Sequence, residues 1–297
     1  MRIHAIRTAL ITVKQNYVAA KGRTRLARLT SSLLDGRWRD IPVYAWAIEH
    51  PEGVIVIDTG ETAKTNNPDY FPLYQRPFWL TQYRFKIHPL DEIGPQLRVR
   101  GISPSDVRWV IMTHAHFDHS DGLYHFPNAE VIFSRKEYTD TMRYRSLHFA
   151  FPGMWPDWLR PRIIDYMPQP FGPFKKSYRV TQTGDVLIVP TPGHTMGHQS
   201  VILQADGVNY FFGGDASFDL PSLLNGTIDA PAFNSYAVES TRRKILALAA
   251  NIPVVYLTTH DHDTERRLRE KVTLDMNQTA RADQNQSVDL PLSSISR

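Results

Sequence analysis

Short apolar runs recur along the chain, separated by charged, glycine-rich or proline-rich stretches. Runs of this length predict strands. They lie at about residues 3–13, 43–50, 53–58, 108–112, 129–133, 186–190, 199–205, 208–213 and 253–257. Between them, Ser134 and Glu137 have the spacing of a capping box, which predicts a helix to about Tyr144, and apolar residues recur at helical spacing from Ala237 to Ala250. Strands interspersed with helices predict an α/β domain.

Residues of metal-binding type directly follow the apolar run at 109–112. The next segment reads THAHFDHSDG and contains His114, His116, Asp118 and His119. Imidazole and carboxylate groups are typical ligands of zinc. Because adjacent side chains point in different directions, we do not expect Asp118 and His119 to serve one metal together, whereas His114 and His116 can. Two divalent metals are therefore favoured over one.

Three later apolar runs also lead to residues that can bind a metal. The run at 186–190 leads through a Thr-Pro-Gly turn to His194, two glycines precede Asp215, and the last strand precedes His260. Taken alone, each also fits an ordinary role, as a turn residue, a helix cap or a hydrogen-bonded polar group. Their recurrence at strand ends favours a common site, because α/β sheets bind ligands at the carboxyl ends of their strands.

In chain order these residues resemble the signature of the metallo-β-lactamase superfamily, from about residue 40 to 262. The resemblance implies a four-layer αβ/βα sandwich with a dinuclear centre, zinc being the favoured ion. It implies a first metal on His114, His116 and His194. It further implies a second metal on Asp118, His119 and His260, with Asp215 as the bridge. Asp58 would orient a metal-bound histidine without binding the metal itself.

Two further features narrow the chemistry within that superfamily. His116 stands where the redox-active diiron branch carries a glutamate, which favours zinc hydrolysis over oxygen chemistry. The chain has no cysteine, which excludes the β-lactamase sites that use Cys on the second metal. We therefore expect a metal-dependent hydrolase that acts on ester bonds.

Among these hydrolases the chain is most similar to the N-acyl homoserine lactonases, since it shares the bridging Asp215 and a Thr-His-Asp context at His260. This resemblance implies opening of a lactone by a hydroxide shared between the metals, with Asp118 and Asp215 as catalytic residues and Asp118 carrying a proton to the alkoxide. Those lactonases usually have a tyrosine three residues after the bridge, where this chain has Phe218, a candidate pocket residue. A phosphotriesterase or general carboxylesterase, and a non-catalytic ligand-binding regulator, are the alternatives.

Two aromatic-rich segments, near 66–88 and 144–178, interrupt the pattern of strands and helices. They are too irregular for long helices. They either line an apolar substrate pocket or pack on the domain as a lid or subunit contact, so a homodimer is left open. If they line the pocket, the small-molecule substrate has an apolar portion.

Length and composition agree with one compact enzyme. The 297 residues predict a single domain at 1–276 and a polar tail at 277–297. The net charge of +4 is too small to indicate nucleic-acid binding, and the basic run Lys21–Arg28 is interpreted as a solvated loop or helix face. No stretch approaches the ~20 apolar residues of a membrane span, and the amino terminus lacks a signal-peptide core. We expect a cytoplasmic protein without membrane or nucleic-acid partners.

Overall fold

The computed structural model describes residues 1–144 and 149–275. In this part of the chain, two sheets form the centre of the molecule. The first sheet has the strand order β4-β1-β2-β3-β5-β6-β7, and the second has the order β12-β11-β10-β9-β8. The strands of the first sheet are β1 (Arg2–Lys14), β2 (Trp38–Glu49), β3 (Val54–Ile57), β4 (Tyr83–Arg84), β5 (Val107–Ile111), β6 (Glu130–Ser134) and β7 (Arg162–Ile164). Those of the second are β8 (Tyr178–Arg179), β9 (Val186–Pro190), β10 (Gln199–Ala205), β11 (Val208–Gly214) and β12 (Val254–Thr258).

Both sheets are mixed, and their parallel strands bring several carboxyl ends together. β3, β5, β6 and β7 pair in parallel in the first sheet, as do β11 and β12 in the second. The remaining pairs are antiparallel, for example β1 with β2 and β10 with β11. Residues that follow β3, β5, β11 and β12 therefore leave the sheets at neighbouring ends.

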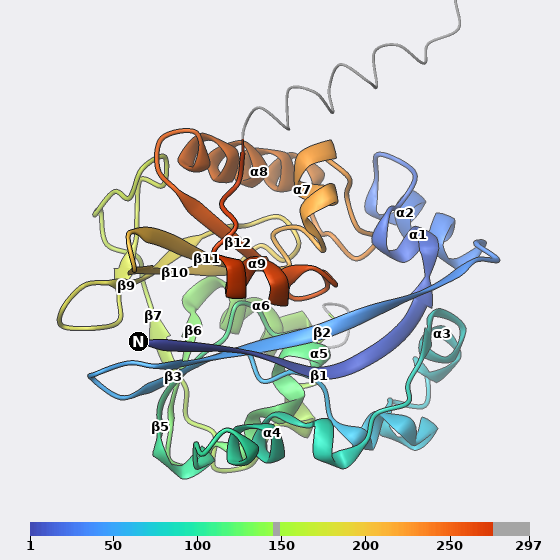
Figure 1. Cartoon of the computed structure of the whole chain (residues 1–297). Helices are drawn as coiled ribbons and strands as arrows, with labels where there is room; N and C mark the ends of the chain where they lie inside the picture. The colour runs from blue at the N-terminus through green and yellow to red at the C-terminus, as the bar shows by residue number, and fades with distance from the viewer. Residues whose placement is uncertain (145–148, 276–297) are drawn as a thin grey trace, which may run out of the picture.

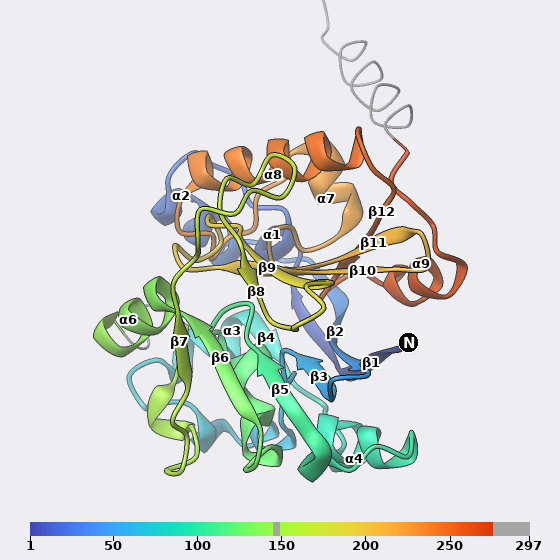
Figure 2. The ribbon, with the colours of Figure 1, turned by 90° about the vertical axis from the view of Figure 1, so that its left-hand side faces the viewer.

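Helices cover the outer face of each sheet, so the molecule has four layers (Figure 2). α7 and α8 lie over the second sheet, and α4 lies under the first (Figure 1). The α-helices are α1 (Gln15–Val18), α2 (Arg25–Leu33), α3 (Arg76–Gln82), α4 (Ile93–Val99), α5 (Phe117–Ser120), α6 (Arg135–Tyr144), α7 (Leu220–Asn225), α8 (Ser235–Ala249) and α9 (Thr264–Glu270). This arrangement confirms the predicted four-layer αβ/βα sandwich.

Successive side chains of a strand point to opposite faces of its sheet, so apolar residues on both faces can pack against the neighbouring layers. One face of each sheet points into the core between them, where the rings of Trp46 and Phe212 lie 5.6 Å apart. The opposite face of the first sheet packs on α4 through Ile93 and Leu97. The opposite face of the second packs on α8 through Ile245.

The long apolar runs predicted their strands to within a few residues, but β4, β7 and β8 were missed. Each of these is two or three residues long, too short to show a period. The helix at 134–144 is confirmed as α6, yet its capping box is only half formed. The Oγ atom of Ser134 accepts a hydrogen bond from the Glu137 amide at 3.1 Å, whereas the Glu137 carboxylate accepts from the Ala115 amide and the Thr195 hydroxyl.

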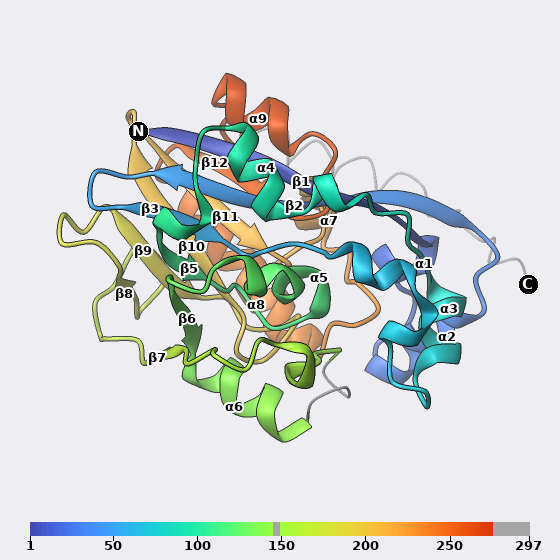
Figure 3. The same cartoon turned by 90° about the horizontal axis from the view of Figure 1, so that it is seen from below.

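The interpretation of Lys21–Arg28 as solvated is wrong for its last residue. α2 begins at Arg25, and the side chain of Arg28 is 1% exposed and donates to the carbonyl of Ala232. The described part of the aromatic segments contains short helices such as α3, as their irregular sequence predicted. α1, α2 and α3 gather at one end of the molecule (Figures 1 and 3).

Two predictions fall partly or wholly outside the described residues: the tail at 277–297, and residues 145–148 of the second aromatic segment. In the parts that are described, none of the helices combines the length and apolar character needed to cross a bilayer.

Candidate metal centre

The predicted site residues lie where the two sheets meet, in segments that follow the ends of strands or on the short helix α5. Asp58 follows β3, and His114 and His116 lie in the loop between β5 and α5. From the second sheet, His194 follows β9, Asp215 follows β11 and His260 follows β12. Asp118 and His119 lie on α5.

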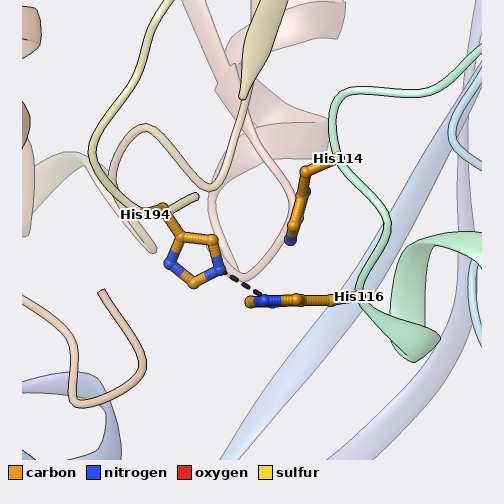
Figure 4. Close-up of side chains that lie close together, drawn as sticks. All are labelled: His114, His116 and His194. Atoms are coloured by element: carbon orange, nitrogen blue, oxygen red, sulfur yellow. Dashed lines mark hydrogen bonds between the residues drawn. The ribbon is translucent and has the colours of Figure 1, made fainter. Parts of the chain in front are cut away.

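All seven predicted metal ligands come together in the structure. Their ligand atoms form three overlapping groups, each within 4.8 Å: His114, His116 and His194; His114, His119 and Asp215; and Asp118, His119 and His260. Figure 4 shows the first group, in which Nε2 of His194 faces Nδ1 of His116 at 2.9 Å. The first and third groups share no residue, so the arrangement is consistent with a binuclear site.

Asp215 lies at the centre of the cluster. One of its carboxylate oxygens, Oδ2, is 3.3 Å from Nε2 of His194, 3.4 Å from Nε2 of His260 and 4.0 Å from Nε2 of His114. Its other oxygen, Oδ1, is 3.4 Å from Nε2 of His119. A carboxylate with both oxygens among four imidazoles has the position that a bridging ligand requires.

The expectation that Asp118 and His119 cannot serve one metal together is wrong. The Oδ1 atom of Asp118 lies 4.0 Å from Nε2 of His119, and both atoms belong to the group that includes His260. The two residues are on α5, where successive side chains diverge by only about 100° rather than by the 180° of a strand. The longer imidazole can therefore reach the same point as the neighbouring carboxylate.

Asp58 contacts His119 directly. Its Oδ2 atom lies 2.8 Å from Nδ1 of His119, and its carboxylate also accepts from the Thr113 amide and hydroxyl, both at 2.7 Å. Asp58 has a left-handed backbone conformation, with φ of 56°, which aspartate tolerates better than most residues. The tight corner after β3 thus directs the carboxylate toward the back of the histidine.

Two supporting residues were missed in the sequence. Asp229 accepts from Nδ1 of His194 at 3.0 Å, as Asp58 does from His119, but it lies in an irregular segment without a recognisable pattern. His198 accepts a hydrogen bond from the Asp215 amide at 3.0 Å, and its Nδ1 lies 2.9 Å from the Thr191 hydroxyl. The position of His198, four residues after His194 in the same turn, was a signal that could have been used.

Burial and charge together make the cluster attractive to a cation. Burial lowers the pKa of His114 well below its usual value, and the neighbouring imidazoles His119, His116 and His194 lower it further. Burial would raise the pKa of Asp215, but the surrounding histidines His260, His119 and His194 hold it well below the usual range. An ionised carboxylate among imidazoles, one of them readily neutral, is a suitable ligand set for a divalent ion.

Unsatisfied polar atoms provide an independent test of that fit. Within the described residues, Nε2 of His114, Nε2 of His119 and Oδ1 of Asp215 are buried without a hydrogen bond. His119 and Asp215 approach to 3.4 Å, but not in hydrogen-bonding geometry. Leaving such atoms unpaired costs about 1–3 kcal/mol each. Because all three point into the cluster, bound metal ions would satisfy them, and the residues fit a binuclear metal site.

The comparison with known proteins agrees with this geometry. Residues 38–260 match the Metallo-beta-lactamase superfamily. The chain belongs to this superfamily. An N-acyl homoserine lactonase from Bacillus sp is 28% identical over 267 residues, covering 86% of this chain and 96% of the relative.

Solved structures share the fold of this chain. An N-acyl homoserine lactone hydrolase with the product N-hexanoyl-L-homoserine bound at its catalytic metal center matches with a TM-score of 0.71 and 22% identity, over 89% of this chain and 94% of that one. AidC, a dizinc quorum-quenching lactonase, matches with a TM-score of 0.62 and 15% identity, over 89% and 88%. These comparisons confirm the predicted superfamily and the resemblance of this chain to the N-acyl homoserine lactonases.

Phe218, the candidate pocket residue, lies beside two of the predicted metal ligands. Its ring centroid is 4.7 Å from that of His260 and 5.7 Å from that of His194. The first aromatic segment packs with Phe149 and Phe151 of the second into a cluster that reaches the metal centre through Phe149, 5.8 Å from His116. A cavity of about 300 Å³ also lies between the two segments, lined by Pro72, Tyr74, Ala150, Phe151, Pro152, Gly153 and Met154. The segments therefore both pack on the domain and border an apolar cavity.

Proposed function

We propose that this protein is a dinuclear metal-dependent hydrolase that opens the ester bond of a lactone, with zinc as the favoured ion. The observation that carries the proposal is the convergence of seven histidine and aspartate side chains around Asp215. The favoured substrate is an N-acyl homoserine lactone. Lactonases of that type align with this chain over nearly their whole length.

In this proposal His114, His116 and His194 would hold one ion, Asp118, His119 and His260 would hold the other, and Asp215 would serve both. When bound, such ions lower the pKa of a coordinated water and polarise a carbonyl oxygen. Asp58 and Asp229 accept hydrogen bonds from Nδ1 of His119 and His194, which leaves each Nε2 to face the metal.

Asp118 is the proposed proton carrier. Its side chain is 11% exposed, compared with 2% for Asp215, so it is the ligand carboxylate that a substrate approaches more readily. A carboxylate with an oxygen free of the metal can take the proton of the attacking water and return it to the departing alkoxide. In a lactone the alkoxide stays attached, so the product is a single hydroxy acid.

The apolar portion of the substrate is proposed to lie toward the aromatic segments. Their cluster adjoins His116, and the cavity beside Phe151 offers apolar surface of a size suited to an acyl chain. We therefore expect turnover to depend on the length of that chain.

A phosphotriesterase or general carboxylesterase is the second candidate. The observation in its favour is Phe218, which presents no hydroxyl to the metal centre although its ring lies 4.7 Å from His260. A non-catalytic regulator would have no need of two metals, whereas the ligand groups are consistent with a binuclear site.

A substrate panel combined with metal analysis tests the proposal. Purified protein is loaded with zinc, its metal content is determined, and the hydrolysis of homoserine lactones of several acyl lengths, aryl esters and phosphotriesters is compared. We expect about two metals per chain and the highest kcat/KM for a lactone. Preference for aryl esters or phosphotriesters would support the second candidate, and fully metallated protein without any hydrolytic activity would support a regulator.

A further inference from the structure

Two buried phenols lie beside the metal centre on the side of Phe218. The ring of Tyr17, on α1, is 6.0 Å from that of Phe218, and the ring of Tyr83, at the start of β4, is 5.0 Å from that of Tyr17. Tyr83 in turn packs 5.8 Å from Phe117, the residue between His116 and Asp118. Tyr17 and Tyr83 are only 5% and 4% exposed, so two polar side chains stand in a mainly apolar cluster.

The carboxylates of the metal centre interact electrostatically with both hydroxyls. Burial is the main cause that raises the pKa of Tyr17 well above its usual value, and the carboxylates of Asp118, Asp229 and Asp215 raise it further. Burial likewise raises the pKa of Tyr83, with contributions from Tyr17, Asp118 and Asp215. Each phenol therefore keeps its proton at neutral pH and can act as a hydrogen-bond donor.

The phenols also contact each other. A hydrogen bond joins the hydroxyls of Tyr17 and Tyr83, and either hydroxyl can be its donor. When Tyr83 is the donor, the proton of Tyr17 remains for an acceptor outside the pair. Tyr83 thereby restricts the direction in which the Tyr17 hydroxyl points.

The backbone around Tyr17 is fixed relative to the metal ligands. Its carbonyl accepts a hydrogen bond from the Ala230 amide at 2.9 Å, and the Ala20 amide donates to the Ile228 carbonyl at 2.9 Å. Between these two contacts lies Asp229, which holds His194. α1 and the metal centre are thus joined by one short segment, as expected for a donor that is oriented before the substrate arrives.

We propose that Tyr17 is a catalytic residue whose hydroxyl donates a hydrogen bond to the substrate carbonyl oxygen as that oxygen gains negative charge, and that Tyr83 is its positioning residue. The inference rests on the proposed ester hydrolysis and supplies the donor that Phe218 lacks. Tyr17 keeps its proton throughout, so no bond to it forms or breaks. Its contribution is greatest in the transition state, where the oxygen is most negative.

The substitution Tyr17→Phe tests this role because it removes one oxygen and keeps the ring. We expect kcat to fall about 100-fold on the best ester substrate of the wild type, with a change of less than about threefold in KM. The zinc content should stay at the wild-type value. Binding of N-hexanoyl-L-homoserine, measured by calorimetry on zinc-loaded protein, should weaken several-fold because the new carboxylate loses a donor.

A matched control and a rescue variant separate donation from packing. Tyr210→Phe removes a phenol hydroxyl that lies 3.2 Å from Asp206, at the opposite end of β11 from Asp215, and should leave kcat unchanged. The double variant Tyr17→Phe with Phe218→Tyr returns a phenol from the neighbouring position and should recover at least tenfold of the lost kcat. Tyr83→Phe, which only frees the Tyr17 hydroxyl, should lose less activity than Tyr17→Phe.

Three results would overturn the inference. One is a Tyr17→Phe variant with wild-type kcat, another is a loss of kcat that parallels a loss of zinc, and the third is a double variant without recovery. If Tyr17→Phe does not fold, wild-type kcat in Tyr83→Phe would also contradict it. Failure of the proposed lactonase function is distinguishable, because wild-type protein would then turn over no lactone, and the same variants would be compared on the ester that it does hydrolyse.

Discussion

Two buried histidine–carboxylate pairs in this molecule look alike but differ in their surroundings. In the site pair, Asp229 lies 3.0 Å from Nδ1 of His194. In the α4 pair, Glu92, the residue before α4, lies 2.9 Å from Nε2 of His125. Both carboxylates are at least 94% buried, and each pair joins segments that are more than 30 residues apart in sequence.

Both carboxylate oxygens of Glu92 in the α4 pair are hydrogen-bonded. The Oε1 atom of Glu92 accepts from the Ala63 amide at 2.9 Å and from the Thr62 hydroxyl at 3.2 Å, and Oε2 accepts from Tyr124 in addition to His125. Although burial opposes ionisation, these donors lower the pKa of Glu92 to about 2. Such a pair connects α4 to its neighbours without any further ligand.

The site pair, by contrast, is one part of an incomplete cluster. The second nitrogen of His194 faces His116 and the carboxylate of Asp215, and nearby atoms of His114 and His119 have no hydrogen bond in the described structure. What distinguishes a binding site from a structural network is therefore the presence of buried polar atoms that still need a partner. The number of ionisable groups alone does not make the distinction.

The largest expected difference between the two regions is in activity. His116→Ala removes a proposed metal ligand and should lower kcat/KM at least about 10³-fold, because the remaining ligands hold the first metal poorly. His125→Ala, the matched change in the α4 pair, should leave kcat/KM of the folded protein within about twofold. Initial rates on the best ester substrate provide the measurement. Similar losses of kcat/KM in His116→Ala and His125→Ala would contradict the distinction between a binding site and a structural pair.

A second difference concerns metal affinity. Asp229→Asn keeps the shape of the side chain but weakens the hydrogen bond that orients His194, so we expect zinc affinity to fall about 10–100-fold. Glu92→Gln makes the same change in the α4 pair and should not alter zinc affinity. Competition with a chelating dye measures both. Equal affinities in Asp229→Asn and wild-type protein would contradict the positioning role of Asp229.

The parts of the site that the sequence predicted are those linked to local patterns. Apolar runs followed by His114, His194 or His260 combine a periodic signal with a ligand-type residue at a strand end. Asp229 and Tyr17 lacked any such signal, since their contacts are with segments that are remote in sequence. Only the fold shows which irregular segment lies behind which histidine.

Local geometry also limited two predictions that concerned neighbouring residues. Asp118 and His119 were expected to diverge as on a strand, but α5 turns both toward one point. Arg28 belongs to a basic run that is typical of a solvated surface, yet it is buried because its guanidinium reaches the carbonyl of Ala232, 204 residues away. In both cases the sequence identified the chemical type of the residue but did not predict the course of the backbone that places its side chain.

A smaller effect is expected on the stability of the α4 region. Glu92→Gln replaces a charged acceptor of four donors by a neutral amide, and the changed hydrogen bonds should lower the free energy of unfolding by about 2 kcal/mol. Urea denaturation at pH 7 measures the change. Activity per folded molecule should stay at the wild-type value, whereas reduced activity with unchanged stability would connect Glu92 to the metal centre and remove the contrast.

The smallest effect should appear when that stability is followed toward acid pH. The pKa of Glu92 is lowered in the folded protein to about 2, from an ordinary value of 4.5, so folding favours its ionised form. Its contribution is therefore fully present above about pH 4.5 and is lost as the pH falls toward 2. The difference in unfolding free energy between wild type and Glu92→Gln should be present at pH 5 and then shrink by pH 3. Because the metal centre is the same in both proteins, its own acid sensitivity cancels in this difference. A difference that stays constant down to pH 3 would mean that the Glu92 carboxylate is not held in its ionised form, and that the α4 pair owes its stability to packing instead.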